Sequence, residues 1–188
     1  MISELFFRIF IKKFTEPNQE KKLNMKHLLI TIAVIIAFSA CQECKKDDSL
    51  NNELERIENL LEKYMIAIEN EDFQMIGNIW DEGDSTMMLG TDSHERLMGW
   101  ANIRNAYQRQ FDLIDDVLIS VQDQYIRINC TGNTAWFSQR MSYNFMYEDV
   151  AHSLKGVRLT GVLVKNSEDQ WKMVQGHLSV PAQVNIGR

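Results

Sequence analysis

Hydrophobic residues follow two different spacings along the chain after residue 53. Between residues 53 and 113, apolar side chains recur at every third or fourth position, which is the spacing of amphipathic helices. This spacing predicts helices over 53–69, from Asp72 to about residue 80, and over about 100–113. From residue 117 onward the apolar period is two, which is typical of strands. Long strands are predicted over 117–128, 134–147, 154–165 and 170–179, and short ones over 86–89 and 95–98.

This order of elements predicts an α+β domain, with the helices on one face of a curved sheet. The long strands follow one another with only short polar turns between them, which favours antiparallel pairing. The folded domain is expected over residues 53–182, with a C-terminal tail over 183–188. The sequence contains no internal repeat.

The first forty residues carry a third pattern, in which a basic stretch precedes an apolar one. Leu28–Phe38 contains only one mildly polar residue, Thr31. A spanning helix needs ~20 apolar residues, so this run is too short to cross a bilayer but fits the apolar core of a signal peptide. The run ends in Phe38-Ser39-Ala40-Cys41, which resembles the lipobox of bacterial lipoproteins, although leucine is commonest where Phe38 stands.

Residues 1–40 are therefore expected to be a signal peptide, with Met25 as the true start because a compact basic segment follows it. The polar residues 41–52 are expected to form a flexible tether. The lipobox resemblance implies that a lipid on Cys41 holds the chain at a membrane. The implied location is the Gram-negative cell envelope, on the periplasmic or surface side of the outer membrane. The alternative is a buried apolar helix followed by a chance cysteine.

Charge separates the two parts of the chain. The 188 residues carry 20 basic and 26 acidic side chains, a net charge of −6. Without residues 1–40, the remainder holds 14 basic and 23 acidic groups, a net charge of −9. Such a domain is a poor partner for nucleic acid. His94, His152 and His177 lack the spacing of metal ligands, so no metal and no cofactor is predicted.

Three groups of local sequences carry a resemblance to a known fold family. The first runs from Leu61 to Asp81 and the second is Gly99–Ile103; the third comprises Gly132–Trp136, Arg158–Thr160 and Gln170–Ser179. In this order they resemble the SnoaL-like and nuclear-transport-factor-like superfamily over about residues 53–182. The resemblance implies a cone-like, curved antiparallel sheet with three N-terminal helices packed on its concave face. It leaves the activity open, since this fold hosts isomerases, cyclases, dehydratases, assembly modules and binding proteins.

The steroid isomerases of this superfamily use a first-helix tyrosine as oxyanion donor, a strand carboxylate as base and a second, protonated carboxylic acid. By resemblance, Tyr64 matches that tyrosine and Tyr107 matches another tyrosine of the pocket. Counted without gaps, the base position falls at Met88 and the second acid at about Gly161. Neither residue can accept a proton, which argues against isomerase chemistry by this route.

A ligand pocket can also be predicted from strand parity. Arg158 and Thr160 share one face of their strand, and His177 shares a face of the next strand with Ser179. If both faces point into the cone, these residues form a polar patch in an aromatic cavity that suits a small carboxylate or carbonyl ligand. The pocket is expected to contain Tyr64, Trp80, Trp100, Tyr107, Arg158, Thr160 and His177, with His177 a weak candidate for catalysis. In the alternative, His177 bonds Ser179 or backbone and Arg158 pairs with an acidic neighbour.

Three classes of function remain from the sequence. The leading one is a lipid-anchored, non-catalytic domain that binds a small organic molecule in its cone. The second is a homodimeric assembly or interaction module, paired through an exposed sheet face that contains Trp136, Met141 or Met146. The third is a SnoaL-like isomerase or cyclase with displaced catalytic residues.

Overall fold

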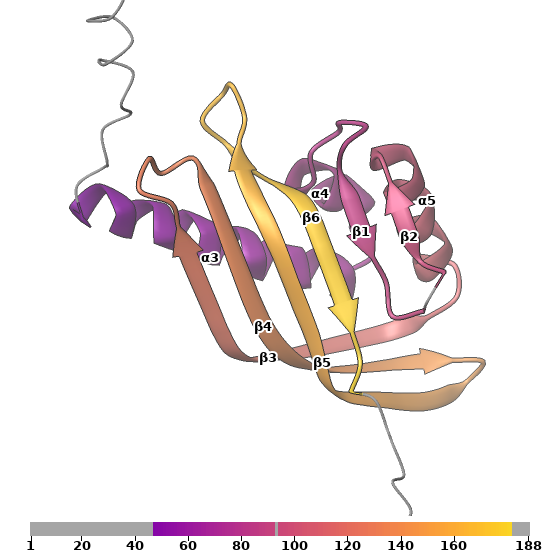
Figure 1. The fold of residues 1–188 in the computed structure, drawn as a ribbon. Helices are drawn as coiled ribbons and strands as arrows, with labels where there is room; N and C mark the ends of the chain where they lie inside the picture. Colours follow the sequence, from indigo (N-terminus) through magenta and orange to yellow (C-terminus); the bar gives the residue numbers. More distant parts are fainter. Residues whose placement is uncertain (1–46, 93, 182–188) are drawn as a thin grey trace, which may run out of the picture. The chain divides into compact units, whose positions relative to one another are not determined.

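The computed structural model describes residues 47–92 and 94–181. The predicted signal peptide, Cys41 and the tail over 183–188 lie outside the described residues. In chain order the elements are α3 (Asp47–Glu69), α4 (Phe73–Ile79), β1 (Met87–Leu89), β2 (Arg96–Met98), α5 (Trp100–Phe111), β3 (Asp115–Ile128), β4 (Thr134–Tyr147), β5 (Val150–Lys165) and β6 (Trp171–Ser179) (Figure 1).

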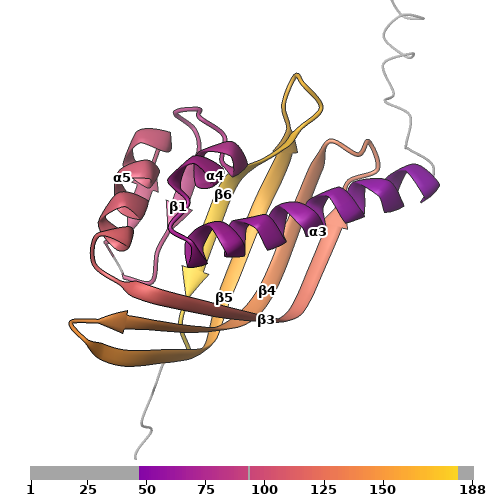
Figure 2. The same ribbon diagram turned by 180° about the vertical axis from the view of Figure 1, so that it is seen from behind.

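The described strands form one six-stranded sheet in the order β2-β1-β6-β5-β4-β3. Figures 1 and 2 show α3 crossing one face of the curved sheet, while the other face carries none of the described helices. The predicted α+β cone fold is confirmed. The four long strands are antiparallel as predicted, but β1 pairs in parallel with β6, so the sheet is mixed. The two parallel strands are far apart in sequence, and no hairpin between them fixes their relative direction.

Helix α3 forms because its apolar residues make one stripe. Ile57, Leu61, Tyr64 and Ile68 are all buried, at the spacing that the sequence predicts. The helix begins at Asp47, however, so residues 47–52 of the predicted tether belong to it. Helix α4 begins after Asp72, as predicted, and the Asp72 carboxylate accepts a hydrogen bond of 2.8 Å from the Met75 amide.

Two glycines that face each other across β5 and β6 bring aromatic rings onto the sheet. Gly161 pairs with Gly176. A Cβ atom at Gly176 would lie 2.9 Å from Cη2 of Trp80, and one at Gly161 would lie 2.5 Å from Cε1 of Phe137. No side chain fits at either position, so both rings lie directly against the backbone.

The far ends of β4 and β5 bend away from the plane of the sheet (Figure 1). The pairing shifts register between Met141 and Tyr143, opposite Gly156, whose φ is +71°. Glycine adopts this left-handed conformation without the cost that a side chain imposes. The bend carries Tyr143 and Leu154 into the wall of a cavity on the helix side of the sheet.

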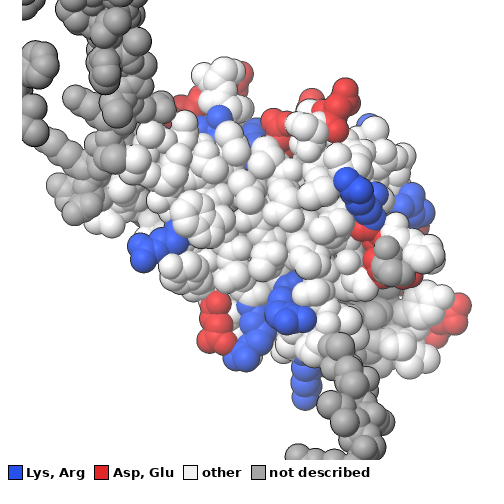
Figure 3. Space-filling view, viewed as in Figure 1, with Lys and Arg blue, Asp and Glu red and all other residues white. Residues whose placement is uncertain are grey.

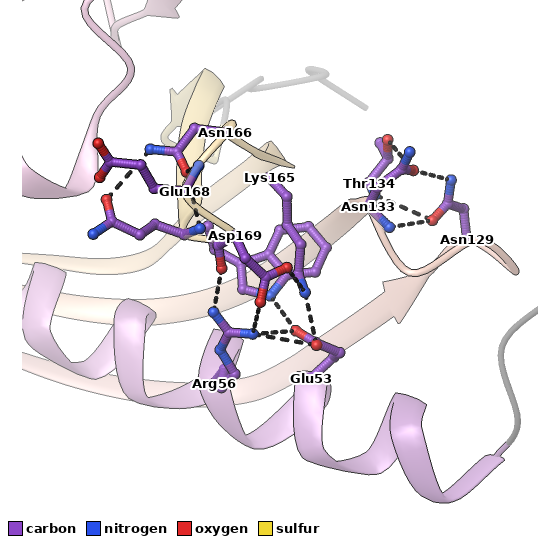
Figure 4. Close-up of polar contacts among 11 residues, drawn as sticks. Glu53, Arg56, Asn129, Asn133, Thr134, Lys165, Asn166, Glu168 and Asp169 are labelled. Carbon is purple, nitrogen blue, oxygen red and sulfur yellow. Dashed lines mark hydrogen bonds and ion pairs between the residues drawn. The ribbon is translucent and has the colours of Figure 1, made fainter.

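A group of charged residues joins the start of α3 to the turn between β5 and β6 (Figure 4). Glu53 is buried, and its carboxylate accepts hydrogen bonds from Lys165 Nζ at 2.7 Å and Trp171 Nε1 at 2.8 Å. Arg56 binds Glu53 at 3.1 Å and Asp169 at 3.0 Å. We call Glu53, Arg56, Lys165, Asp169 and Trp171 the α3 clasp.

The clasp shifts the protonation of both its acids. Burial by itself raises the pKa of Glu53, but the hydrogen bonds from Lys165 and Trp171 and the nearby positive charges outweigh burial and lower it. Hydrogen bonds from Lys165 and Arg56 lower the pKa of Asp169 to about 2. Both carboxylates are therefore ionised at neutral pH, and the ionised form is the one that stabilises the fold.

We expect Glu53→Gln to destabilise the folded chain by about 2 kcal/mol at neutral pH, because it weakens charge-assisted bonds to Lys165 and Trp171. A lowered pKa means that this stabilisation is present above the ordinary value of 4.5 and is lost as the pH falls through the folded-state value. Urea unfolding of the wild type and Glu53→Gln over this pH range measures the difference. The control is Glu55→Gln, at an exposed position of the same helix. A constant difference down to pH values well below 4.5 would contradict the assignment.

Candidate functional site

A cavity of about 230 Å³ lies between the helices and the inner face of the sheet. Most of its wall is apolar or aromatic. The lining residues are Tyr64, Ile68, Met88, Thr91, Tyr107, Gln110, Ile114, Met141, Tyr143, Phe145, Leu154, Val157, Leu159 and Leu178. Mainly apolar walls with a few polar groups are typical of sites for small organic molecules.

A hydrogen-bonded group of three aromatic residues forms the polar end of this cavity. The hydroxyls of Tyr64 on α3 and Tyr107 on α5 are hydrogen-bonded to each other. Trp80, just after α4, donates from Nε1 to the Tyr107 hydroxyl at 3.2 Å. The rings of Tyr64 and Tyr107 meet edge to face, with their centroids 6.4 Å apart. All three side chains are buried, so their positions are fixed by packing as well as by hydrogen bonds.

Burial keeps the tyrosine hydroxyls of the cavity protonated. It raises the pKa of Tyr64 to about 12, although the hydrogen bond with Tyr107 acts in the opposite direction. Burial likewise raises the pKa of Tyr107 well above its ordinary value, and the neighbouring Tyr64 adds to this effect. It also raises the pKa of Tyr143. At neutral pH these groups are hydrogen-bond donors.

The number of hydroxyl protons exceeds the number of acceptors available to them. The bond between Tyr64 and Tyr107 uses one of their two protons, whichever residue donates. On the opposite wall, the Tyr143 hydroxyl accepts a bond of 2.8 Å from Gln110 Nε2, which leaves its own proton unused. Within the described part of the chain, no further acceptor contacts these hydroxyls. The cavity therefore offers two O–H groups to a ligand.

Among the described residues, no carboxylate, histidine, lysine or arginine lines the cavity. The isomerase base position, Met88, does line the cavity, and it supplies a thioether. The position of the second acid, Gly161, is covered by the Phe137 ring. Residues 47–92 and 94–181 contain no group of three or more histidines, cysteines or acids placed to hold a metal ion. Nor does any helix in these ranges have the length and apolarity to cross a membrane.

The structure brings together part of the predicted pocket. Tyr64 and Tyr107 line the cavity, and Trp80 lies behind Tyr107 as its hydrogen-bond donor. Trp100 lies elsewhere, at the contact between α4 and α5, where a Cβ atom at Gly77 would be 3.5 Å from its ring.

The structure places Arg158, Thr160 and His177 on the outer face of the sheet, and this corrects the expected polar patch. Thr160 pairs with His177 as the parity argument requires, but their neighbours Leu159 and Leu178 are the residues that line the cavity. Arg158 is exposed, and it donates to the Val180 carbonyl at 3.5 Å instead of pairing with an acid. Successive side chains of a strand point to opposite faces, so the cavity receives the apolar set.

The three residues predicted to lie on one exposed sheet face, through which two copies would pair, do not share a face. Met141 is buried in the cavity wall, whereas Trp136 is 48% exposed on the outer face and Met146 is half-buried. Figure 3 shows this outer face, where charged side chains lie mainly toward the margins and the centre is uncharged.

The sequence interpretation missed Tyr143 and Gln110. A signal for each was present, because Tyr143 has the same parity as the apolar Met141 and Phe145, and Gln110 follows Tyr107 by three residues on a helix. Tyr143 was hidden by the irregular pairing near Gly156, since the register shift places it in the bent part of the sheet.

The fold and the cavity agree with a comparison against protein families. A model described as SnoaL-like domain matches residues 57–183. The chain belongs to the SnoaL-like domain family. The matched range begins at buried Ile57 of α3 and includes all three tyrosines that line the cavity, and it confirms the resemblance found in the sequence. No curated protein sequence matches the chain.

Solved structures confirm the fold of this SnoaL-like domain. A nuclear transport factor 2-like superfamily protein from Salmonella enterica superposes with a TM-score of 0.65 at 18% identity, over 73% of this chain and 96% of that one. A ketosteroid isomerase-like protein from Erwinia carotovora gives 0.59 at 15% identity, over 71% and 99%. An NTF2-like protein of unknown function from Pseudomonas putida gives 0.56 at 14%, over 69% and 87%. At such identities, the likeness shows the fold alone.

We expect Tyr107→Phe to destabilise the SnoaL-like domain by about 2 kcal/mol, because it leaves the buried Nε1 of Trp80 without an acceptor and also removes the bond to Tyr64. Tyr64→Phe removes one of these bonds and should cost about 1 kcal/mol. Urea unfolding followed by circular dichroism measures both. Tyr125→Phe, on the exposed outer face, is the control. Equal losses of unfolding free energy in Tyr64→Phe and Tyr107→Phe would contradict the assignment of two hydrogen bonds to the Tyr107 hydroxyl.

Proposed function

We propose that the SnoaL-like domain binds, without transforming, a small and largely apolar organic molecule that carries a carbonyl or similar oxygen. One observation carries this proposal: an uncharged, mostly apolar cavity presents two hydroxyl protons without acceptors. A ligand oxygen would accept these protons, and the hydrocarbon part of the ligand would contact the apolar wall.

The chemistry of the wall favours binding over catalysis. Removal of a proton next to a carbonyl needs a base within hydrogen-bond reach. The described wall contains tyrosines with raised pKa values, a threonine and a glutamine as its polar groups, and none of these is a base at neutral pH. The hydroxyls can still polarise a bound carbonyl, which selects for ligands with a strong acceptor oxygen.

The proposed binding domain is held at a membrane through Cys41. This part of the proposal is supported by the sequence alone, namely the basic stretch, the apolar run Leu28–Phe38 and the small residues before Cys41. A domain tethered in this way would meet its ligand in the cell envelope.

Binding can be tested with tetralone, an apolar bicyclic ketone, by isothermal titration calorimetry on the full chain. Trp80 donates to Tyr107, and with Tyr107 donating in turn to Tyr64 the proton left for the ketone oxygen is the one on Tyr64. We therefore expect Tyr64→Phe and Tyr143→Phe each to weaken tetralone binding by about fivefold to tenfold. Tyr125→Phe loses the same hydroxyl from an exposed residue of the outer face and should bind as the wild type does. Equal affinity in all four proteins would overturn the proposed role of the hydroxyls.

The non-catalytic part of the proposal has its own measurement. Nuclear magnetic resonance in deuterium oxide follows the exchange of the hydrogens next to the tetralone carbonyl. We expect the same exchange rate with and without the protein. An acceleration that Tyr64→Phe abolishes would assign enzymatic proton transfer to this cavity instead.

Anchoring is tested by expressing the full chain in a Gram-negative host with radioactive palmitate. We expect the wild-type chain to be labelled and to fractionate with membranes, because the lipid is attached to the Cys41 thiol. Cys41→Ser should be unlabelled. Equal labelling of both chains, or of neither, would overturn the anchor.

A further inference from the structure

A second compartment of about 290 Å³ opens beside the cavity. The two lie side by side, because they share part of their walls, including Met88, Thr91, Tyr107, Gln110 and Leu178. The second compartment differs in its chemistry, because Glu95 and Arg109 also line it. We call it the vestibule.

The two charged residues of the vestibule differ in what they contact. Glu95 follows the turn between β1 and β2, and its Oε2 accepts a hydrogen bond of 3.1 Å from the Asp92 amide. A Cβ atom at Gly90 would lie 1.9 Å from this same oxygen, so the carboxylate lies directly against the glycine backbone. The Glu95 carboxylate therefore stabilises the turn between β1 and β2.

Arg109 lies in the last turn of α5 and is exposed. It has no hydrogen-bond or ion-pair partner among the described residues. It is also the only basic side chain among the described residues that line either compartment. The planar guanidinium has five N–H donors and matches a carboxylate in geometry. In the vestibule, an incoming ligand can therefore find a free cation next to an apolar cavity.

We infer that the ligand is an amphiphilic organic acid: its largely apolar body, with the oxygen that meets the hydroxyls, occupies the cavity, and its carboxylate binds Arg109 in the vestibule. This inference rests on the proposed function and names its ligand class. A carboxylate inside the cavity itself would lose its hydration without gaining a cation. At Arg109 the carboxylate keeps contact with water and gains a charge-assisted hydrogen bond. The overall charge of −9 in residues 41–188 gives no general attraction for anions, so recognition of the acid depends on this one residue.

The test compares decanoate with its uncharged methyl ester, which has the same apolar chain. Isothermal titration calorimetry on the full chain should give roughly fivefold tighter binding of decanoate than of methyl decanoate. Arg109→Gln should abolish this preference, and Arg109→Lys should keep part of it, because the positive charge remains. The matched control is Arg104→Gln, five residues earlier on α5, where the guanidinium lies over the Phe73 ring, 5.1 Å from its centroid.

Several results would overturn the inference. Equal binding of acid and ester by the wild type would do so, and so would a preference that survives in Arg109→Gln or disappears in Arg104→Gln. If the chain binds tetralone through Tyr64 and Tyr143 but does not bind decanoate, the inference that the ligand is an organic acid is wrong and the proposed function stands. A chain that binds none of the three compounds would refute both.

Discussion

The contact between the Trp80 ring and the backbone at Gly176 determines where the polar end of the cavity lies. Any side chain at Gly176 would displace the ring, since a Cβ atom there would be 2.9 Å from it. The position of the ring aims the indole Nε1 at the Tyr107 hydroxyl, which in turn holds the hydroxyl of Tyr64. The glycine at 176 therefore fixes the position of the Trp80 ring. Through the two hydrogen bonds that follow, it also fixes the hydroxyl that a ligand would meet.

The buried polar groups of the α3 clasp and those of the cavity differ in how completely they are hydrogen-bonded. In the clasp, the Glu53 carboxylate is hydrogen-bonded by Arg56, Lys165 and Trp171, so its negative charge is used within the fold. In the cavity, two hydroxyl protons have no acceptor among the described residues, which costs stability that the proposed ligand's oxygen would restore. The clasp and the hydroxyls proposed to bind the ligand therefore lie toward opposite ends of α3, with Glu53 near one end and Tyr64 near the other.

Periodicity was sufficient to predict the helices, the long strands and the inward direction of Tyr64 and Tyr107, but it did not identify Tyr143 as part of the cavity wall. Tyr64 and Tyr107 lie on helix stripes whose inward direction is fixed by the apolar residues around them. The faces of β5 were harder to assign, although the alternation of Val157 and Leu159 with Arg158 shows which set the interior takes. The polar Arg158 was predicted to face the pocket, but the apolar Val157 and Leu159 are the residues that face the interior. Register shifts and the parallel pairing of β1 depend on contacts distant in sequence, so local spacing does not encode them.

The clasp also has a mechanical consequence. In a chain held from its N-terminal side, tension enters the domain at the start of α3, near Glu53. There Glu53 of the helix is hydrogen-bonded to Lys165 and Trp171, which lie on either side of the turn between β5 and β6 (Figure 4). A force on the helix is therefore shared between the two hydrogen bonds. A pull from that side therefore strains the part of the helix that precedes Glu53 before it reaches the sheet. Because Tyr64 lies beyond Glu53 on the same helix, the clasp stands between the point where the force enters and the cavity.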